Sequence, residues 1–368
     1  MSFITNIRSV AKYESKILVR SWFFRIFTLL VVVFLGFFNF AMMLMEDNFG
    51  LWFAKSVSSN IPYLNLLLLN TGQAVVAVFL SSEFLKRDKK LDTSEVFYVR
   101  PLSNAEYVIG KIWGNLRVFL LLNLLVLAIV LAFNFMASGI TVDWQAYGVY
   151  FLLISLPTLI FIIGLSIFLM LVLRNQALTF ILLLGYIGLT LFYIQDKFYY
   201  LFDYMVYNLP LFKSTIVGFS SLELILNHRA IYFFAGLGFI FFTIFVFKRL
   251  PNARRSHYPW LFLSLCMFLL AGTAGYRHVR SILREGEIRA LYTSINNKYV
   301  HEPKMAIDRY DISVEQKPET IRSVVGMKGT ALATSEIFTF CLNPGLKVGE
   351  VKEGEKPLDF KREAVSYT

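Results

Sequence analysis

Seven long apolar runs divide the first three quarters of this sequence. They lie near residues 26–45, 61–82, 113–135, 147–173, 177–194, 230–247 and 259–276. An α-helix needs about 20 apolar residues to cross the roughly 30 Å hydrocarbon core of a bilayer, and each run is close to that length. The chain is 57% hydrophobic, with a mean hydropathy of +0.59, which is too apolar for a soluble domain. The sequence therefore predicts an α-helical polytopic membrane protein.

The distribution of charge predicts how the spans are oriented. The net charge is +11, but residues from Arg277 onward hold 15 Lys/Arg against 13 Asp/Glu, so most of the excess lies in residues 1–276. With the N-terminus inside, the cytoplasmic connections hold 17 Lys/Arg and the opposite ones hold four, namely Lys55, Lys197, Lys213 and Arg229. This asymmetry predicts a cytoplasmic N-terminus and, after seven spans, an extracytoplasmic C-terminus. It also assigns the basic residues to the lipid bilayer rather than to nucleic acid.

Two segments outside the predicted spans, residues 1–25 and 195–229, have patterns of their own. In residues 1–25, apolar residues recur at steps of three and four with Arg and Lys between them, which predicts an amphipathic interfacial helix; a plain basic flank of the first span is the alternative. The first apolar run starts late and has no small-residue cleavage site, so no cleavable signal peptide is expected. The outer connection 195–229 is rich in Tyr and Phe, which favours short interfacial helices or an aromatic belt around an ordinary loop.

The chain changes in character after the sixth apolar run. Residues 251–276 contain the seventh span, and residues 277–302 predict a polar juxtamembrane helix. Residues 303–368 predict a small antiparallel β region, with strands near 307–314, 337–342, 346–351 and 358–363. The two cysteines, Cys266 and Cys341, fall in different environments, so no disulfide is expected.

The sequence contains no motif for catalysis or for nucleotide binding. It has no GxxxxGK[ST] phosphate loop, no HExxH zinc motif and no GxSxG nucleophile motif. We therefore expect no enzyme activity, no metal site and no bound cofactor in this chain. No Asp, Glu, Lys or Arg lies in the interior of the seven runs, away from their ends, which argues against an ion-coupled carrier. Asn70, Thr71 and Gln73 lie mid-span, and either line a translocation path or form interhelical hydrogen bonds.

A charged segment, residues 82–111, separates the second and third runs. It carries the basic residues Lys86, Arg87, Lys89, Lys90, Arg100 and Lys111 and the acidic residues Glu83, Asp88, Asp92, Glu95 and Glu106. Asp92 and Thr93 form a helix-start pattern, Pro101 interrupts the chain, and Ser103 with Glu106 forms a capping box for the next helix. The pattern predicts a helix, a short helix, a break and a further helix, which together form an elbow attached to two spans.

This arrangement resembles the permease subunit of ABC transporters of the type-2 exporter class, in which a cytoplasmic coupling segment joins the second and third spans. The matching positions are Glu83, Asp92, Thr93, Arg100, Pro101, Ser103 and Lys111, with residues 1–25 and 195–229 matching the family's interfacial helices. In that family a glycine usually precedes the threonine of the coupling segment, whereas Asp92 precedes Thr93 in this sequence. The resemblance covers about residues 1–250 and implies a six-span permease domain at 26–250.

The resemblance also implies partners and a location. A separate ATPase subunit would dock on residues 82–111 and bind the ATP, and a second permease copy would complete the transporter as a homodimer or pseudo-dimer. The location would be the bacterial cytoplasmic membrane. The substrate and the direction of transport do not follow from it.

The C-terminal part has a second, shorter resemblance. The stretch 338–346, followed by residues up to Phe360, is similar to strands that begin an aminopeptidase N-like extracytoplasmic domain, which is fused to such permeases in some large bacterial proteins. The zinc-binding catalytic part of that domain is not in this sequence. Either the chain is a truncated relative or its β region serves as a binding or packing module. A membrane anchor or sensor that presents the β region is therefore the alternative function, and a secondary carrier or channel is the third.

Overall fold

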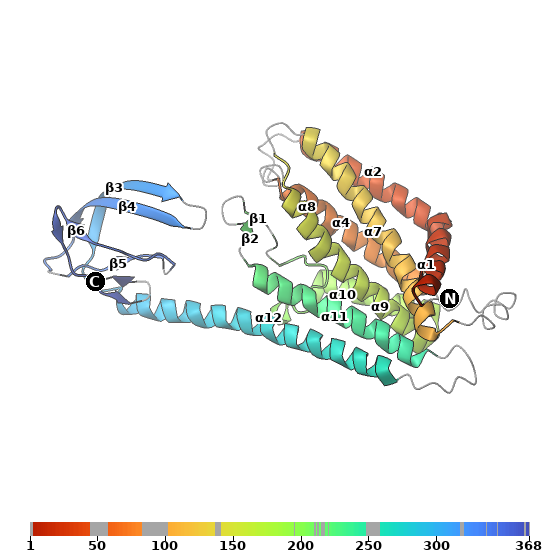
Figure 1. Ribbon diagram of the computed structural model, residues 1–368. Helices are drawn as coiled ribbons and strands as arrows, with labels where there is room; N and C mark the ends of the chain where they lie inside the picture. Colours follow the sequence, from red (N-terminus) through yellow and green to blue (C-terminus); the bar gives the residue numbers. More distant parts are fainter. Residues whose placement is uncertain are drawn as a thin grey trace. The chain divides into compact units, whose positions relative to one another are not determined.

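A computed structural model describes residues 3–44, 58–82, 102–136, 141–194, 196–209, 211, 213–214, 218–219, 221–247, 258–316, 320–335, 337–343, 345–363 and 366–367. The chain divides into two compact units, Met1–Arg280 and Ser281–Thr368. The first unit is helical (Figure 1) and the second carries most of the strands.

Seven helices in the described residues are long and apolar enough to span a membrane, which confirms a helical polytopic membrane protein. The spans are α2 (Trp22–Leu44), α4 (Asn60–Ser82), α7 (Asn104–Met136), a composite of α8 (Trp144–Tyr150), η1 (Phe151–Ser155) and α9 (Leu156–Leu173), a composite of α10 (Gln176–Leu189) and η2 (Thr190–Ile194), α11 (Leu222–Val246) and α12 (Tyr258–Lys298). Helix α1 (Phe3–Arg20) precedes them, and only Ser21 separates it from α2.

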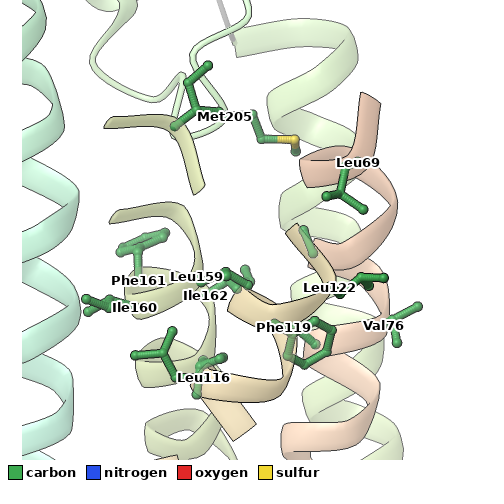
Figure 2. Packing of buried hydrophobic residues seen from close by; sticks show 14 of the residues in the cluster. Leu69, Val76, Leu116, Phe119, Leu122, Leu159, Ile160, Phe161, Ile162 and Met205 are labelled. Atoms are coloured by element: carbon green, nitrogen blue, oxygen red, sulfur yellow. The ribbon is translucent and has the colours of Figure 1, made fainter. Parts of the chain in front are cut away.

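The core of the first unit lies where α4, α7 and α9 meet. Figure 2 shows Phe119 of α7 and Ile162 of α9 in this packing, together with Met205 from the connection between α10 and α11. Helices α9 and α11 cross closely at Gly164 and Gly236, because a Cβ on either glycine would lie 2.7 Å from the other helix's backbone. Such close crossings by small residues are typical of helices packed in lipid.

One predicted boundary is wrong. The sixth span begins at Leu222 rather than near residue 230, so Glu223, His228 and Arg229 belong to helix α11 and not to the outer connection. The prediction that no charged residue lies inside a span therefore fails for α11. The seventh span and the predicted polar helix form one continuous helix, α12, because nothing in residues 258–298 interrupts the helical ladder.

The outer connection also differs from its prediction. Its described residues form no α-helix; they form one helical turn, η3 (Phe198–Tyr200), and a hairpin of two short strands, β1 (Lys213–Ser214) and β2 (Gly218–Phe219). Only part of the segment lies on the surface: Phe198 is 62% exposed, whereas Tyr204, Met205 and Val206 are at most 1% exposed. Side chains from α11 and α12 bond its carbonyl groups in place of a helical ladder, as described below.

The second unit is built around one long hairpin. Strands β3 (Met305–Gln316) and β4 (Ile321–Ala331) pair in antiparallel register, with Ile312 opposite Val325. Five two-residue strands follow: β5 (Phe340–Cys341), β6 (Lys352–Glu353), β7 (Lys356–Pro357), β8 (Arg362–Glu363) and β9 (Ser366–Tyr367). The small antiparallel β region is confirmed, but β4 was not predicted, because its residues lack a clear apolar and polar alternation.

Candidate functional site

Most of the predicted contact residues of the charged segment lie outside the described residues. These are Glu83, Asp92, Thr93, Arg100 and Pro101. Ser103 and Lys111 are described, and so are Asn70, Thr71 and Gln73. The contacts around Ser103 and Lys111 show which helices hold the C-terminal end of the charged segment.

The charged segment runs into α7 through the predicted capping box. The backbone N–H of Glu106 donates to Ser103 Oγ at 3.2 Å, and the backbone N–H of Ser103 donates to Glu106 Oε2 at 2.6 Å. This pair of bonds satisfies two of the donors that a helix start leaves open. The other carboxylate oxygen of Glu106 accepts a hydrogen bond from Asn6 Nδ2 of α1 at 2.8 Å. The first turn of α7 is therefore fixed to the N-terminal helix.

Helices α1 and α7 approach each other at two glycines. A Cβ on Gly110 would lie 2.7 Å from the Cβ of Val10, and a Cβ on Gly114 would lie 2.7 Å from the Cβ of Glu14 and 2.9 Å from the carbonyl oxygen of Ala11. Larger residues at these positions would push the helices apart. Glycines four residues apart on one helix face allow this close contact.

Polar groups join the same two helices. Ser15 Oγ of α1 lies 2.7 Å from the carbonyl oxygen of Gly114 and accepts a hydrogen bond from Arg117 Nε at 2.7 Å. Lys111 Nζ lies 3.7 Å from Glu14 Oε2, and the two side chains are only 4% and 5% exposed. Separating them would leave two charges buried without partners, which is strongly unfavourable. Lys111, which the resemblance assigns to the partner contact, is thus held beneath α1.

The start of α7 is also attached to the end of α11. Asn104 Nδ2 donates to the carbonyl oxygen of Phe247 at 2.7 Å, and the rings of Tyr107 and Phe247 stack with centroids 5.5 Å apart. The first turns of α7 are therefore anchored on two sides, by α1 and by α11. A displacement of the charged segment cannot be absorbed by loosening this helix start alone.

Four buried side chains form a closed ring of hydrogen bonds between α4, α7 and η1. Gln73 Nε2 donates to Asn70 Oδ1 at 2.6 Å, Asn123 Nδ2 to Gln73 Oε1 at 2.8 Å, Ser155 Oγ to Asn123 Oδ1 at 2.7 Å, and Asn70 Nδ2 to Ser155 Oγ at 3.3 Å. All four side chains are 0% exposed. Since every member both donates and accepts within the ring, the cost of burying these groups is offset.

The ring includes two of the three mid-span residues singled out in the sequence. Asn70 and Gln73 belong to it, whereas the hydroxyl of Thr71 donates to the carbonyl oxygen of Leu67 at 3.1 Å, within its own helix. Helices α4 and α7 enter and leave the charged segment, so the ring ties together the two spans that carry it. A role of these residues in a translocation path stays a prediction.

Arg229 of α11 holds η1, the π-helical turn that contributes Ser155 to the ring. Pro157 has no N–H, so it cannot bond the carbonyl group of Leu153 four residues earlier. Arg229 Nε donates to that carbonyl at 2.6 Å, and Arg229 Nη2 donates to Thr158 Oγ1 at 2.8 Å. The side chain is 2% exposed. An arginine of α11 therefore replaces the bond that the proline removes from the α8–η1–α9 span.

The same arginine reaches the outer connection, where η3 has unusual backbone geometry. Arg229 Nη1 donates to the carbonyl oxygen of Tyr204 at 2.9 Å. Phe198, Tyr199 and Tyr200 have φ angles of 52°, 59° and 61°. Left-handed conformation costs non-glycine residues roughly 1–2 kcal/mol each, so neighbouring groups must hold it in place.

Three side chains of α11 and α12 supply that support by binding consecutive carbonyl groups of the turn. His278 Nε2 lies 2.9 Å from the carbonyl oxygen of Tyr199, His228 Nε2 lies 3.0 Å from that of Tyr200, and the hydroxyl of Tyr232 donates to that of Leu201. Carbonyl oxygens only accept hydrogen bonds, so both imidazoles carry a proton on Nε2. The two histidine rings lie 5.0 Å apart.

Two carboxylates, Asp143 and Asp203, lie in connections between the spans. Asp203 accepts hydrogen bonds from the backbone N–H groups of Tyr207 and Asn208 at 2.9 and 2.8 Å, yet burial still raises its pKa. Asp143 caps α8 through Ala146 N at 3.1 Å and lies 2.6 Å from Lys213 Nζ. Partial burial opposes its ionisation, but the hydrogen bonds from Lys213 and Ala146 outweigh that effect and lower the pKa of Asp143.

Sequence reasoning missed the histidines and treated Arg229 as a loop residue. The available signal was Pro157 inside an apolar run, because a buried proline leaves a carbonyl group that needs a donor from elsewhere. No His, Cys, Asp or Glu cluster that could hold a metal ion occurs in the described ranges. No family model and no curated protein sequence matches this chain significantly.

Proposed function

We propose that this protein is the membrane-spanning permease subunit of an ATP-driven ABC-type transporter in a bacterial cytoplasmic membrane. A separate ATPase docks on residues 82–111, and a second permease copy completes the transporter. The substrate is left open. The proposal rests on the charged segment's resemblance to a coupling segment and on one structural observation, the double anchoring of the first turns of α7, which form the C-terminal end of that segment.

The anchored helix start supports a role in passing on force. Asn6 of α1 bonds Glu106 at 2.8 Å, and Asn104 bonds the end of α11 at 2.7 Å. An ATPase that pushes on the charged segment would therefore move α1, α7 and α11 together. A floppy loop would dissipate the same push by its own rearrangement.

The buried contacts offer a continuous route for such a movement. The amide ring links α4 and α7 to η1 through Ser155, and Arg229 links the residues around η1 to the outer connection at Tyr204. The contacts between different elements are hydrogen bonds between described residues, and the backbone of η1 and α9 joins Ser155 to the residues that Arg229 contacts; all of them lie inside the first unit. In this proposal the route lets a cytoplasmic push reach the opposite end of the bundle.

The first experiment is a pull-down of the tagged full chain in a gentle detergent, followed by mass spectrometry. We expect a stoichiometric ATPase subunit to co-purify with the wild-type protein. The variant with Asp92→Ala, Thr93→Ala, Arg100→Ala and Pro101→Ala should lose it, because these residues carry the resemblance to the ATPase contact. The matched control, Arg254→Ala with Arg255→Ala in another predicted cytoplasmic connection, should retain it.

The outcomes separate the proposal from its competitors. A clean homo-oligomer without any ATPase would overturn the transporter proposal. Unchanged ATPase binding in the fourfold variant would overturn the assignment of the docking site to residues 82–111.

A second candidate function is a membrane anchor or sensor that presents its C-terminal β region. It is favoured by one observation: Tyr310, Ile312 and Val314 lie on one face of β3 opposite Met327 and Val325 of β4, and all five are at least 44% exposed. A resemblance to the start of an aminopeptidase N-like domain points to the same region. Recovery of a partner bound to the β region, in place of an ATPase, would support this candidate.

A secondary carrier is a third candidate, and one argument against it has changed. The absence of a charge inside the spans no longer holds, because Arg229 lies in α11. Its guanidinium donates to three backbone carbonyl groups, those of Leu153, Ile154 and Tyr204, and to the hydroxyl of Thr158. These contacts give Arg229 a role in holding the π-helical turn rather than a coupling ion. The ATP-driven transporter is therefore still preferred over the secondary carrier.

A further inference from the structure

We propose that the exposed face of α1, the face turned away from α7, is a binding surface for the headgroups of anionic phospholipids. The surface consists of four exposed basic side chains, Arg8, Lys12, Lys16 and Arg20. They are spaced four residues apart, so they follow one side of the helix over about 18 Å. This inference does not depend on the transporter proposal.

The opposite face of α1 fixes the orientation of the basic row. Ala11, Glu14, Ser15 and Leu18 are buried, and the glycine contacts and the Ser15–Arg117 bond hold them against α7. The basic residues consequently cannot rotate inward. The only acidic residue of α1, Glu14, is paired with Lys111 on the buried side. The exposed face therefore carries four positive charges and no negative one.

The basic row has no counter-charge within the described residues. None of Arg8, Lys12, Lys16 and Arg20 forms an ion pair with any described residue, although ion pairs such as Lys213–Asp143 are found elsewhere in the same unit. Like charges four residues apart repel one another along a helix. An anionic surface outside the protein would remove this repulsion, which an uncharged surface would not.

The position of α1 selects a membrane rather than a soluble anion as the source of that surface. Only Ser21 separates α1 from the spanning helix α2, so α1 lies where the chain enters the bilayer. Aromatic side chains lie beside the row: Tyr13, which follows Lys12 on α1, is 67% exposed, and Trp22, at the start of α2, is 74% exposed. Exposed aromatic residues beside a basic stripe are typical of helices at the headgroup level. An acidic protein partner would need the charges but not these aromatic side chains.

The test measures which lipid collects next to α1 in the full-length protein. A fluorophore is attached to Ser9→Cys, on the exposed face, in a background with Cys266→Ser and Cys341→Ser. The protein is reconstituted in phosphatidylcholine vesicles that contain an equal small fraction of spin-labelled phosphatidylglycerol or spin-labelled phosphatidylcholine. Each basic residue near an anionic surface favours the anionic lipid by about fivefold. We therefore expect phosphatidylglycerol to quench the fluorophore at least about fivefold more effectively.

Variants and salt identify the cause of the preference. Changing Arg8, Lys12, Lys16 and Arg20 to Gln should make the two lipids quench equally. The matched control changes four exposed arginines of α12 to Gln and should keep the preference; these are Arg277, Arg280, Arg284 and Arg289. Raising the salt from 0.1 to 1 M shortens the screening length from about 10 to about 3 Å and should weaken the wild-type preference.

Two results would overturn the inference. Equal quenching by both lipids in the wild-type protein would show that α1 does not recognise the anionic headgroup. Loss of a co-purifying protein in the fourfold Gln variant, with the lipid preference unchanged, would assign the basic row to a protein partner instead. The substituted side chains are exposed, and an unchanged helical circular dichroism spectrum verifies that each variant is folded.

Discussion

Single polar side chains in this protein replace backbone hydrogen bonds that its sequence leaves open. Pro157 removes one donor from a span, and Arg229 supplies another from a neighbouring helix at 2.6 Å. The left-handed turn at Phe198–Tyr200 is bonded in the same way by side chains of α11 and α12. Since no water is available in hydrocarbon to replace a donor inside a span, Arg229 is needed for the geometry around Leu153.

Replacing Arg229 by methionine should therefore destabilise the protein strongly. Arg229→Met keeps most of the side-chain volume but removes the donor to the carbonyl groups of Leu153 and Ile154, whereas the carbonyl group of Tyr204 keeps its bond from the hydroxyl of Thr158. Unpaired buried polar groups cost about 1–3 kcal/mol each, so we expect the free energy of unfolding to fall by about 2–4 kcal/mol. Titration with SDS in mixed micelles measures this. The control Arg280→Met, at an exposed position, should change it little, and an equally small loss for Arg229→Met would contradict the role assigned to the guanidinium.

The ion pair of Asp143 and Lys213 should make stability depend on pH. Asp143→Asn preserves the oxygen that caps α8 but removes the charge that pairs with Lys213. We expect a loss of about 0.5–1 kcal/mol at pH 7. The folded state lowers the pKa of Asp143, so this contribution is complete above the ordinary carboxylate pKa and disappears as pH falls through the lower folded value.

The measurement compares the unfolding free energies of wild-type and Asp143→Asn protein between pH 3 and pH 7. The two curves should converge at the acidic end. A difference that stays constant over this range would mean that the pair contributes nothing through its charge.

At the scale of helices, the contact between α1 and α7 depends on small residues and is easy to disturb. Gly114→Ala would place a Cβ 2.7 Å from that of Glu14 and 2.9 Å from a backbone oxygen, so the helices must separate. We expect a loss of about 1–3 kcal/mol, the usual cost of overpacking. Gly148→Ala is the control, because nothing lies within 4 Å of its added Cβ.

Proteolysis provides the second readout for the same variant. If α1 detaches from α7, trypsin should cleave after Lys12 and Lys16 sooner in Gly114→Ala than in wild-type protein. Gly148→Ala should be cleaved at the wild-type rate. Unchanged cleavage and stability in Gly114→Ala would show that the two helices are not held by this close contact.

The sequence predicted whole elements better than it predicted their polar contacts. Length and hydropathy located all seven spans, because a hydrocarbon core imposes those properties on every spanning helix. The capping box at Ser103 and Glu106 was also predictable, since its partners are three residues apart. The start of α11 was not, because His228 and Arg229 read as loop residues unless the bonds they donate are known.

The same reasoning explains what was missed at the candidate site. Asn70 and Gln73 lie on one helix and were noticed as a pair. Their ring partners Asn123 and Ser155 come from two other helices, up to 85 residues away in the sequence. A pairing across such separations depends on how helices pack, and one sequence does not specify it.

For the whole molecule, the predicted topology can be tested with a native cysteine. Cys341 is exposed in the second unit, whereas Cys266 lies within the spanning part of α12. If the C-terminal unit is extracytoplasmic, a membrane-impermeant maleimide added to intact spheroplasts should label Cys341 in a Cys266→Ser background. The basic residues that precede α2 predict the opposite side for the N-terminus. A Ser9→Cys probe, in protein without both native cysteines, should therefore react only after the membrane is opened. Labelling of Cys341 only after lysis would mean that the number of crossings is even, and it would remove the β region from the outer surface on which the anchor and sensor alternative depends.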